Sequence, residues 1–567
     1  MANLNVVIAG AAGQGVQSAA AIFGRLCLRQ GLHLFTTQDY QSRVRGGHNF
    51  MRIRISDEPL GASVRLIDYL VALNEESIRI HLYDLRPEAI TLCMEQDAEG
   101  FNDPRLRPLP NDAGPAKADN PRFVGVKLLA MLIEMIGFDR RNLTDAVDIQ
   151  LGKRIKPEVL QLNFDAAQAC ADLVSDEDRH ELPFALHPET QRMFVDGHEA
   201  LALGMVAGGI GVYAGYPMSP STSLMTALAS FSREMGVVVE QVEDEVAAIN
   251  VACGAAFAGA RAAVGTSGAG ISLMSETIGL AGISETPVVI LDAQRPGPST
   301  GMATRTEQAD LMQVVFASQG EFPRAVIAPA DHEDAFYMGA EAFNIAERWQ
   351  IPVFIMTDQA FADSQSTVEE FDPSRVTIDR GPVAEEPAAP GTLMPRYAVT
   401  DSGVSPRAYP VLSEWIIQQD SHEHTEIGHL SDNIDNRITQ FQKRMRKHDG
   451  IAAEFPGPEI VGDPEEALFL CWGSTCGPLL EAAALMRKEG HRLGVAVFRH
   501  LYPMNRKAVR RALAPAERLY TVEMNFTGQL GKLLLLECGI ATTAHIGKID
   551  GRLFTVKEIL FRLREVI

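Results

Sequence analysis

The run GYPMSPSTS at residues 215–223 opens the stretch that decides the fold of this chain. It follows the apolar run GVYA and is rich in turn-forming proline and serine. Four more runs follow up to Arg295: GVVVEQVEDE (236–245), AAINVACGAAFAGA (247–260), GTSGAG (265–270) and PVVILDAQR (287–295). Each includes the end of an apolar strand, the start of a helix, or the loop between them. An open parallel α/β sheet with a ligand crevice at the carboxyl ends of its strands requires this pattern.

The α/β pattern continues on both sides of this stretch. Because 567 residues exceed what one core can hold, we expect a multi-domain α/β protein. The predicted parts are an α/β domain at 1–180, a linker at 181–195, a central domain at 196–366, a connecting region at 367–456 and a last α/β domain at 457–567. The connecting region lacks apolar periodicity, which indicates an arm that wraps another domain or a partner.

Composition excludes several classes of protein. A net charge of -22 argues against nucleic acid and anionic membranes as partners. The seven cysteines are scattered and never spaced as CxxC, so neither a disulfide framework nor a metal or iron–sulfur site held by this chain alone is expected. No apolar run reaches ~18 residues, and the start MANLNVVIAG lacks a basic signal region. We therefore expect a cytoplasmic protein.

The glycine turn GAAGQG at 10–15 lies between a predicted strand and a predicted helix. Free backbone N–H groups at such a helix start bind anions, so a phosphate or an acyl-CoA-like ligand is one interpretation and a tight structural turn is the other. Arg43 and Arg45, beside a Gly-Gly turn, are possible coenzyme A or anion contacts, or part of a solvated loop. Asp39 ends the next strand and leaves a nicotinamide-dependent dehydrogenase as an alternative, against which Ala12 counts.

Glu245 stands where a β-type run becomes a helix, followed by Val246, Ala247 and Ala248. A carboxyl group in an apolar pocket disfavours its charged form and is suited to holding a proton. Alternatively, Glu243, Asp244 and Glu245 are acids that cap the helix. The residues alone leave both interpretations open.

Hydroxyls and a cation lie at the other turns. Ser219 belongs to a rigid turn that either fixes a carboxylate or caps the following helix. Arg295 follows a strand directly, and its planar guanidinium matches a carboxylate, although a surface ion pair is the plainer interpretation. The turn at 265–270 either binds an anion or packs tightly.

The order of these motifs resembles one family, the 2-oxoacid:ferredoxin oxidoreductases. The runs similar to the family's pyrimidine-binding domain are GYPMSPST (215–222), EDEVAAINVACGAAFAGA (243–260), TSGAGISLMSETIG (266–279) and DAQRPGPSTGMATRTEQADL (292–311). AGAAGQGV (9–16) and SRVRGG (42–47) resemble its gamma component. HLYPMN (500–505) and VEMNFTGQLGKLL (522–534) resemble its small, transketolase-C-like C-terminal domain. The resemblance is to an alpha subunit with a fused gamma domain.

The resemblance implies roles for individual residues. Glu245 would hold a proton at N1′ of the aminopyrimidine of thiamine diphosphate. Ser219, where threonine is usual, and Arg295 would bind the substrate carboxylate, and Arg305 would meet a distal carboxylate. The cofactor contacts would be Tyr216, Pro217, Thr266, Ser267 and Gly268.

The sequence contains neither a GDG-type motif for Mg²⁺ and the diphosphate nor a cysteine set for a [4Fe–4S] cluster. The resemblance implies that a beta subunit carries these groups in an alpha2beta2 assembly, and that ferredoxin docks mainly on beta. The expected reaction oxidises 2-oxoglutarate with coenzyme A to an acyl-CoA and CO2. Alternatives are a pyruvate or broad-specificity enzyme, the nicotinamide dehydrogenase, and a non-catalytic scaffold.

Overall fold

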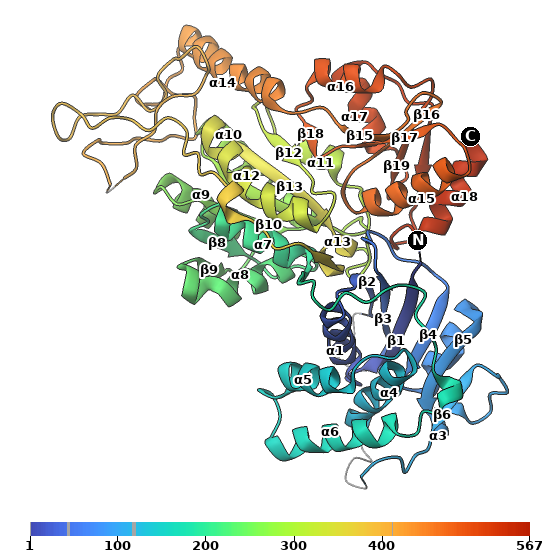
Figure 1. Ribbon diagram of the computed structural model, residues 1–567. Helices are drawn as coiled ribbons and strands as arrows, with labels where there is room; N and C mark the ends of the chain where they lie inside the picture. Colours follow the sequence, from blue (N-terminus) through green and yellow to red (C-terminus); the bar gives the residue numbers. More distant parts are fainter. Residues whose placement is uncertain (1, 42–45, 116–120, 411) are drawn as a thin grey trace. The chain divides into compact units, whose positions relative to one another are not determined.

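The structure is a computed structural model that describes residues 2–41, 46–115, 121–410 and 412–567 (Figure 1). The chain forms two compact units. The first comprises Met1–Val195, Asp363–Glu370 and Thr555–Lys557, and the second Asp196–Ala362, Phe371–Phe554 and Glu558–Ile567.

The first unit is built on an eight-stranded sheet in the order β6-β5-β4-β1-β3-β2-β14-β7. Its strands are β1 (Leu4–Ala12), β2 (His33–Asp39), β3 (Gly46–Ser56), β4 (Ile67–Ala72), β5 (Leu85–Met94), β6 (Leu106–Leu109), β7 (Met193–Asp196) and β14 (Gln365–Val368). β3 runs antiparallel to both β1 and β2, whereas β4, β5 and β6 continue parallel to β1. β14 pairs antiparallel with β2, so a segment from far along the chain belongs to this sheet.

Among the described residues, the α-helices that accompany this sheet are α1 (Val16–Arg29), α2 (Glu75–His81), α3 (Glu95–Ala98), α4 (Pro121–Met135), α5 (Arg140–Leu151) and α6 (Pro157–Ala171). Apolar residues of α1 recur at helical spacing and face the core, where Phe23 and Cys27 are buried with Ile8 of β1 and Leu132 of α4. Apolar residues at helical spacing therefore produce the packing that the sequence predicts.

The connection of β1 through α1 to β2 differs from a dinucleotide-binding unit. In that fold the second strand lies beside the first and parallel to it. Here β3 lies between β1 and β2 and runs antiparallel to both. The first unit therefore lacks the strand arrangement on which the nicotinamide alternative depends.

The second unit contains a central seven-stranded sheet in the order β18-β12-β13-β11-β10-β8-β9. Its strands are β8 (Val212–Gly215), β9 (Val238–Gln241), β10 (Ala262–Thr266), β11 (Val288–Gln294), β12 (Ala325–Ile327), β13 (Pro352–Asp358) and β18 (His500–Tyr502). All neighbours are parallel except β12 and β18. β10, β11 and β13 are buried along their whole length, as expected where helices cover both faces.

The helices of this part are α7 (Gly197–Ala207), α8 (Thr222–Met235), α9 (Glu245–Phe257), α10 (Gly268–Ile283), α11 (Leu311–Val315), α12 (His332–Trp349) and α13 (Gln359–Asp363). α7 and α12 pack closely because Gly204 of α7 has no side chain. A Cβ there would overlap the carbonyl oxygen of Phe336.

A five-stranded sheet in the order β15-β17-β16-β19-β20 completes the second unit. Its strands are β15 (Glu459–Gly462), β16 (Ala467–Cys471), β17 (Leu493–Val497), β19 (Leu519–Glu523) and β20 (Ala544–Gly547), and its helices α15 (Cys476–Lys488), α16 (Arg506–Leu513), α17 (Gln529–Cys538) and α18 (Val556–Val566). Leu470, Trp472 and Phe498 share one core with Val326 and Phe354 of the central sheet. The multi-domain α/β class predicted from the sequence is confirmed. The predicted domain boundaries stay a prediction.

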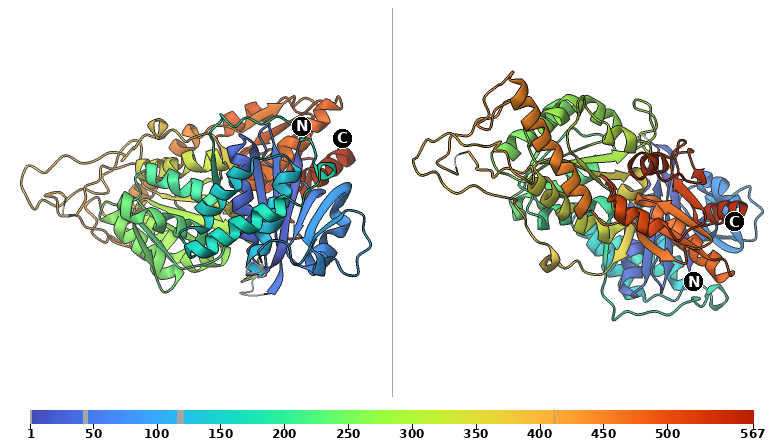
Figure 2. Two further views of the ribbon diagram at one scale, coloured as in Figure 1. Left: turned by 60° about the horizontal axis from the view of Figure 1, so that its bottom comes forward. Right: turned by 90° about the horizontal axis from the view of Figure 1, so that it is seen from above.

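The connecting region holds mostly irregular chain followed by the long helix α14 (Ile434–Glu454) (Figures 1 and 2). An ionic cluster joins α14 to the connection between α10 and β11. Lys443 Nζ donates to Glu285 Oε1 at 2.6 Å, Lys447 Nζ donates to the other oxygen, and all three side chains are at most 1% exposed. Burial raises the pKa of Glu285, but the facing Lys447 and Lys443 ammonium groups bring it below its usual range.

A second buried set fixes the segment before α14. Glu347 of α12 accepts from Arg261 at 2.8 Å and from Arg407 at 3.0 Å, with all three side chains nearly inaccessible. None of the helices in the described part of the chain is both long and apolar enough to cross a bilayer.

Glu285→Gln should destabilise the second unit by ~3–5 kcal/mol, because it leaves two ammonium groups buried without a counter-charge. The fluorescence of Trp349 during urea unfolding should report the change, since its indole N–H donates to Glu454 of α14. The triple change Glu285→Leu, Lys443→Met and Lys447→Met removes the carboxylate and both ammonium groups together and should recover most of the loss. Wild-type stability of Glu285→Gln alone would contradict the role assigned to this cluster.

Candidate functional site

Three neighbouring strands of the central sheet end at the same edge. β8, β10 and β11 are adjacent and parallel, so the turns that follow them lie together. The turn after β8 carries Ser219, the turn after β10 carries Ser267, and Arg295 follows β11 directly. Ligands of open α/β sheets bind at this edge.

Glu245 is the first residue of α9 and differs from the two acids before it. Asp244 is the helix cap, since its carboxylate accepts from the backbone N–H of Ala247 at 2.7 Å. Glu243 and Asp244 are exposed, whereas Glu245 is 3% exposed and its Oε1 has no hydrogen-bond partner in the structure. Helix capping therefore accounts for the acid at position 244 but not for the acid at position 245. A buried carboxyl oxygen without a partner indicates a place for a ligand donor.

The first turn of α10 lies directly against this carboxyl group. A Cβ at Gly270 would overlap Thr266 Oγ1 and would stand 2.9 Å from Glu245 Cγ. Only glycine fits there, and its absence of a side chain lets Glu245 and Thr266 lie close together.

Arg295 joins the turn after β8 to the same edge. Its Nη1 donates to the backbone carbonyl of Ser219 at 2.7 Å, and its Nε has no partner. Burial lowers the pKa of Arg295, and the charge of Glu245 opposes that shift. The structure thus brings Glu245, Ser219 and Arg295 together. This contact uses the backbone carbonyl of Ser219. The predicted role of its exposed side-chain hydroxyl in binding the substrate carboxylate stays a prediction.

The predicted cofactor contacts lie at the same turns. Tyr216 and Pro217 are exposed directly after β8. Thr266 and Ser267 are buried, and their hydroxyls donate to the sulfur of Met218 at 3.7 and 3.3 Å. Because a thioether is a weak acceptor, these hydroxyls are poorly satisfied within the chain. They fit a polar ligand beside Glu245.

Two carboxyl groups that the sequence interpretation missed lie beneath this edge. Asp292 of β11 is fully buried, both of its oxygens lack partners, and burial with the neighbouring Asp310 raises its pKa well above the usual range. Burial and the charge of Glu307 raise the pKa of Asp310 to about 7. Asp310 contacts the start of α10, since a Cβ at Gly268 would stand 2.5 Å from its Oδ2. An acid inside the apolar run VVILDAQ is the signal that could have found Asp292.

Three predicted residues remain: Arg305, Arg43 and Arg45. Arg305 ends a turn whose backbone N–H donates to Met302, and its side-chain stem lies against Gly551 of the C-terminal region. Arg43 and Arg45 lie outside the described residues. The glycine turn of the first unit lines a hollow of about 580 Å³ together with Ser18, Gln38 and Asn49. Gly15 caps α1 there without a side-chain hydrogen bond.

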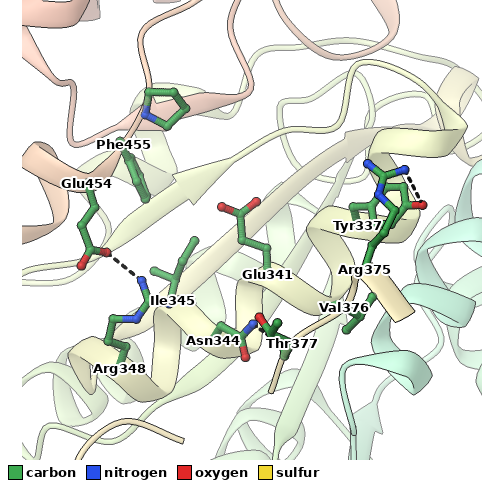
Figure 3. Close-up of a pocket in the computed structure, with 12 residues that line it drawn as sticks. Tyr337, Glu341, Asn344, Ile345, Arg348, Arg375, Val376, Thr377, Glu454 and Phe455 are labelled. Atoms are coloured by element: carbon green, nitrogen blue, oxygen red, sulfur yellow. Dashed lines mark hydrogen bonds and ion pairs between the residues drawn. The ribbon is translucent and has the colours of Figure 1, made fainter. Parts of the chain in front are cut away.

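A separate hollow of about 620 Å³ lies on the outer face of α12, and Figure 3 shows its lining. Its charged groups are already paired within the chain: Arg348 with Glu454 at 2.9 Å, and Arg375 with the hydroxyl of Tyr337 at 2.9 Å. None of the predicted site residues that the structure describes lines it.

Gly270→Ala should lower the stability of the second unit by ~1–3 kcal/mol, because the added methyl group forces Thr266 or Glu245 to move. Thermal unfolding measures this change. Gly125→Ala in α4 is the matched control, since a Cβ there meets its nearest atom at 3.4 Å and fits. Equal stability of the two variants would show that the first turn of α10 does not pack on Glu245 as described.

Comparison with known proteins gives three family models. One for "pyruvate flavodoxin/ferredoxin oxidoreductase, thiamine diP-bdg" matches residues 203–443. One for "pyruvate ferredoxin/flavodoxin oxidoreductase" matches residues 5–173, and one for "pyruvate:ferredoxin oxidoreductase core domain II" matches residues 466–559.

Individual relatives match along the whole chain. The alpha subunit of 2-oxoacid:ferredoxin oxidoreductase 2 from Aeropyrum pernix is 31% identical over 636 residues, covering 100% of this chain and 98% of its own. The 2-oxoglutarate oxidoreductase subunit KorA of Mycobacterium tuberculosis is 28% identical, covering 98% and 90%. A structure of 2-oxoglutarate:ferredoxin oxidoreductase from Magnetococcus marinus, with 2-oxoglutarate, coenzyme A and succinyl-CoA bound, is 27% identical with a TM-score of 0.91, covering 100% and 99%. The family resemblance is confirmed, and the chain belongs to the 2-oxoacid:ferredoxin oxidoreductases, whose alpha subunits it matches from end to end.

Proposed function

We propose that this chain is the alpha subunit of a 2-oxoglutarate:ferredoxin oxidoreductase, which converts 2-oxoglutarate and coenzyme A to the acyl-CoA and CO2 and passes electrons to ferredoxin. The observation that carries the proposal is the buried, unpartnered carboxyl oxygen of Glu245 at the strand edge that also carries Arg295. The relatives named for 2-oxoglutarate support this substrate.

Thiamine diphosphate, when bound, supplies a nucleophilic carbon and an electron sink for loss of CO2. The residues at the edge fit its aminopyrimidine end. Glu245 Oε1, which is buried and lacks a partner, would hold a proton at N1′, and the Thr266 and Ser267 hydroxyls would offer polar contacts beside it. Tyr216 and Pro217 would form the exposed lip of the cofactor site.

Arg295 would clamp the substrate carboxylate, because its Nε is unused and its Nη1 is held in place by Ser219. The Ser219 hydroxyl would donate a second hydrogen bond. We assign Arg305 to the distal carboxylate, which distinguishes 2-oxoglutarate from pyruvate. Pyruvate or broad specificity is the alternative, supported by relatives named only for 2-oxoacids.

The other wall of the site would come from a beta subunit. α9 and α10 are neighbouring helices with exposed apolar side chains: Val246 is 44% and Leu273 56% exposed. Gly254 on α9 faces open space. Such a face suits burial by a second chain. We place Mg²⁺, the diphosphate contacts and the [4Fe–4S] cluster on that subunit. The assembly would be a cytoplasmic alpha2beta2 complex in which the connecting region makes a further contact with beta. Ferredoxin would dock mainly on beta.

Coenzyme A would enter as co-substrate. The hollow at the glycine turn offers free N–H groups at the start of α1, with no acidic residue in the first turn. Backbone donors at a helix start favour phosphate groups. Arg43 and Arg45 are proposed to add positive charge there.

Replacing Glu245 tests the proposal. The complex is produced with its small subunit and assayed by coenzyme A-dependent reduction of a viologen dye with a panel of 2-oxoacids. Glu245→Gln should lower kcat by ~100-fold or more, because an amide cannot hold the proton at N1′. Glu243→Gln, which changes an exposed acid two residues earlier, should leave kcat unchanged. Full activity of Glu245→Gln would support the scaffold alternative, and no activity of the loaded wild-type complex with any 2-oxoacid would refute the proposal.

Arg305→Met tests the substrate choice. Losing a charge-assisted hydrogen bond of ~1.5–3 kcal/mol should raise the KM for 2-oxoglutarate by about 10-fold or more. The KM for pyruvate should stay the same, since pyruvate has no distal carboxylate. Arg552→Met changes an exposed arginine beside Gly551 and serves as the control. Equal effects on both substrates would mean that Arg305 acts by packing on Gly551.

A further inference from the structure

Helix α16 carries the cations Arg506, Lys507, Arg510 and Arg511 on one exposed face. Its opposite face buries Val509 and Leu513 in the core of the second unit. The cluster is unusual in a chain with a net charge of -22. Figure 1 shows α16 beside α17 in the C-terminal part.

Two of these cations do not help α16 to form. Arg506 and Lys507 lie in its first turn, where the helix dipole favours negative charge. Arg506 and Arg510, like Lys507 and Arg511, are four residues apart, so their like charges repel along the helix. The start of α16 is instead fixed by Asn505, whose side chain accepts from the backbone N–H of Ala508 at 3.1 Å. Helix stability therefore gives no reason for Arg506 and Lys507, whereas the helix dipole favours Arg510 and Arg511 in the last turn.

Three of these four cations have no hydrogen-bond or ion-pair partner among the described residues. Arg510 donates from Nε and Nη2 to the carbonyl of Cys538, at 3.1 and 2.8 Å, and so holds the end of α17. Within the described part of the chain, Arg506, Lys507 and Arg511 make no side-chain hydrogen bond or ion pair. The charge of Glu537 in α17 acts on the pKa of Cys538, as do the charges of Arg506 and Arg510. Among the described residues, Glu537 forms no salt bridge with Arg506, Lys507 or Arg511. Three cations therefore face solvent.

The chemistry of this face fits a transient acidic partner. Permanent subunit interfaces bury apolar side chains, and the outer face of α16 offers none in this cluster. Weak redox encounters are small and polar, and charge complementarity speeds their formation. In the family reaction the protein that must bind and leave in each cycle is the electron carrier.

We propose that the exposed cations of α16 form a capture surface for an acidic ferredoxin, a proposal that rests on the proposed function. Carboxylates of the carrier would face Arg506, Lys507 and Arg511 and steer it toward the complex. Electron transfer itself would still occur at the partner subunit. The alpha chain would thereby contribute to docking despite its overall negative charge.

The test is the triple variant Arg506→Glu, Lys507→Glu and Arg511→Glu in the whole complex, with Arg510 left to hold α17. At low ionic strength the KM for a negatively charged ferredoxin should rise about 10-fold or more, and added salt should reduce the difference. Reduction of a viologen dye should be unchanged, since a small dye needs no docking surface. The acids introduced at positions 506 and 507 favour the first turn of the helix, whereas the acid at position 511 opposes the dipole in the last turn. Thermal unfolding of the variant, which should stay close to that of wild type, therefore shows whether the fold is kept.

The matched control reverses Lys153, Arg154 and Lys156, three exposed cations of the first unit, and changes the net charge equally. It should shift the KM for ferredoxin far less. An unchanged KM in the α16 variant, an equal rise in both variants, or loss of the small subunit on purification would overturn the proposal.

Binding of oxidised ferredoxin to the immobilised complex, measured without turnover, gives a second readout. Weaker binding of the α16 variant alone supports the capture surface whatever 2-oxoacid the enzyme uses. Equal binding of wild type and variant refutes it. Failure of the wild-type complex to reduce the dye concerns the proposed function only.

Discussion

The space between the first turn of α10 and the carboxyl group of Glu245 is the constraint on which the site depends. Gly270 has room for a hydrogen atom and no more, since a Cβ would overlap Thr266 Oγ1. This close approach places the end of β10 and the starts of α9 and α10 against one another. It also shields the carboxyl group from water, and an uncompensated polar atom in such surroundings is stable only when a ligand supplies its partner.

Much of the site could be predicted because strand ends of a parallel sheet converge wherever the sequence places them. The turns after β8, β10 and β11 were therefore expected at one edge. The choice between Asp244 and Glu245 could not be made, since both are acids at a helix start and only burial distinguishes them. Asp292 was hidden inside an apolar strand, where sequence gives no indication that its oxygens lack partners.

Pairing between strands that are far apart in the sequence is the part of the fold that could not be predicted. β14 joins the sheet of the first unit through β2, and Leu34 N donates to Thr367 Oγ1 across more than three hundred residues. No local pattern encodes such a partner. The region predicted as a wrapping arm contains the helix α14, whose lysines are buried on Glu285. Cationic side chains have opposite roles in two helices: the α14 lysines are paired and inaccessible, whereas three of the α16 cations are exposed and have no partner among the described residues.

The strand order of both sheets has a consequence for synthesis on the ribosome. β18 pairs with β12 at the edge of the central sheet, and β14 closes over β2 in the first unit. In each case the later strand leaves the ribosome long after its partner, on the order of ten seconds or more at ordinary translation rates. During that interval β2 and β12 expose unpaired edges that invite wrong pairing. We therefore expect the nascent chain to bind a chaperone before either sheet is complete.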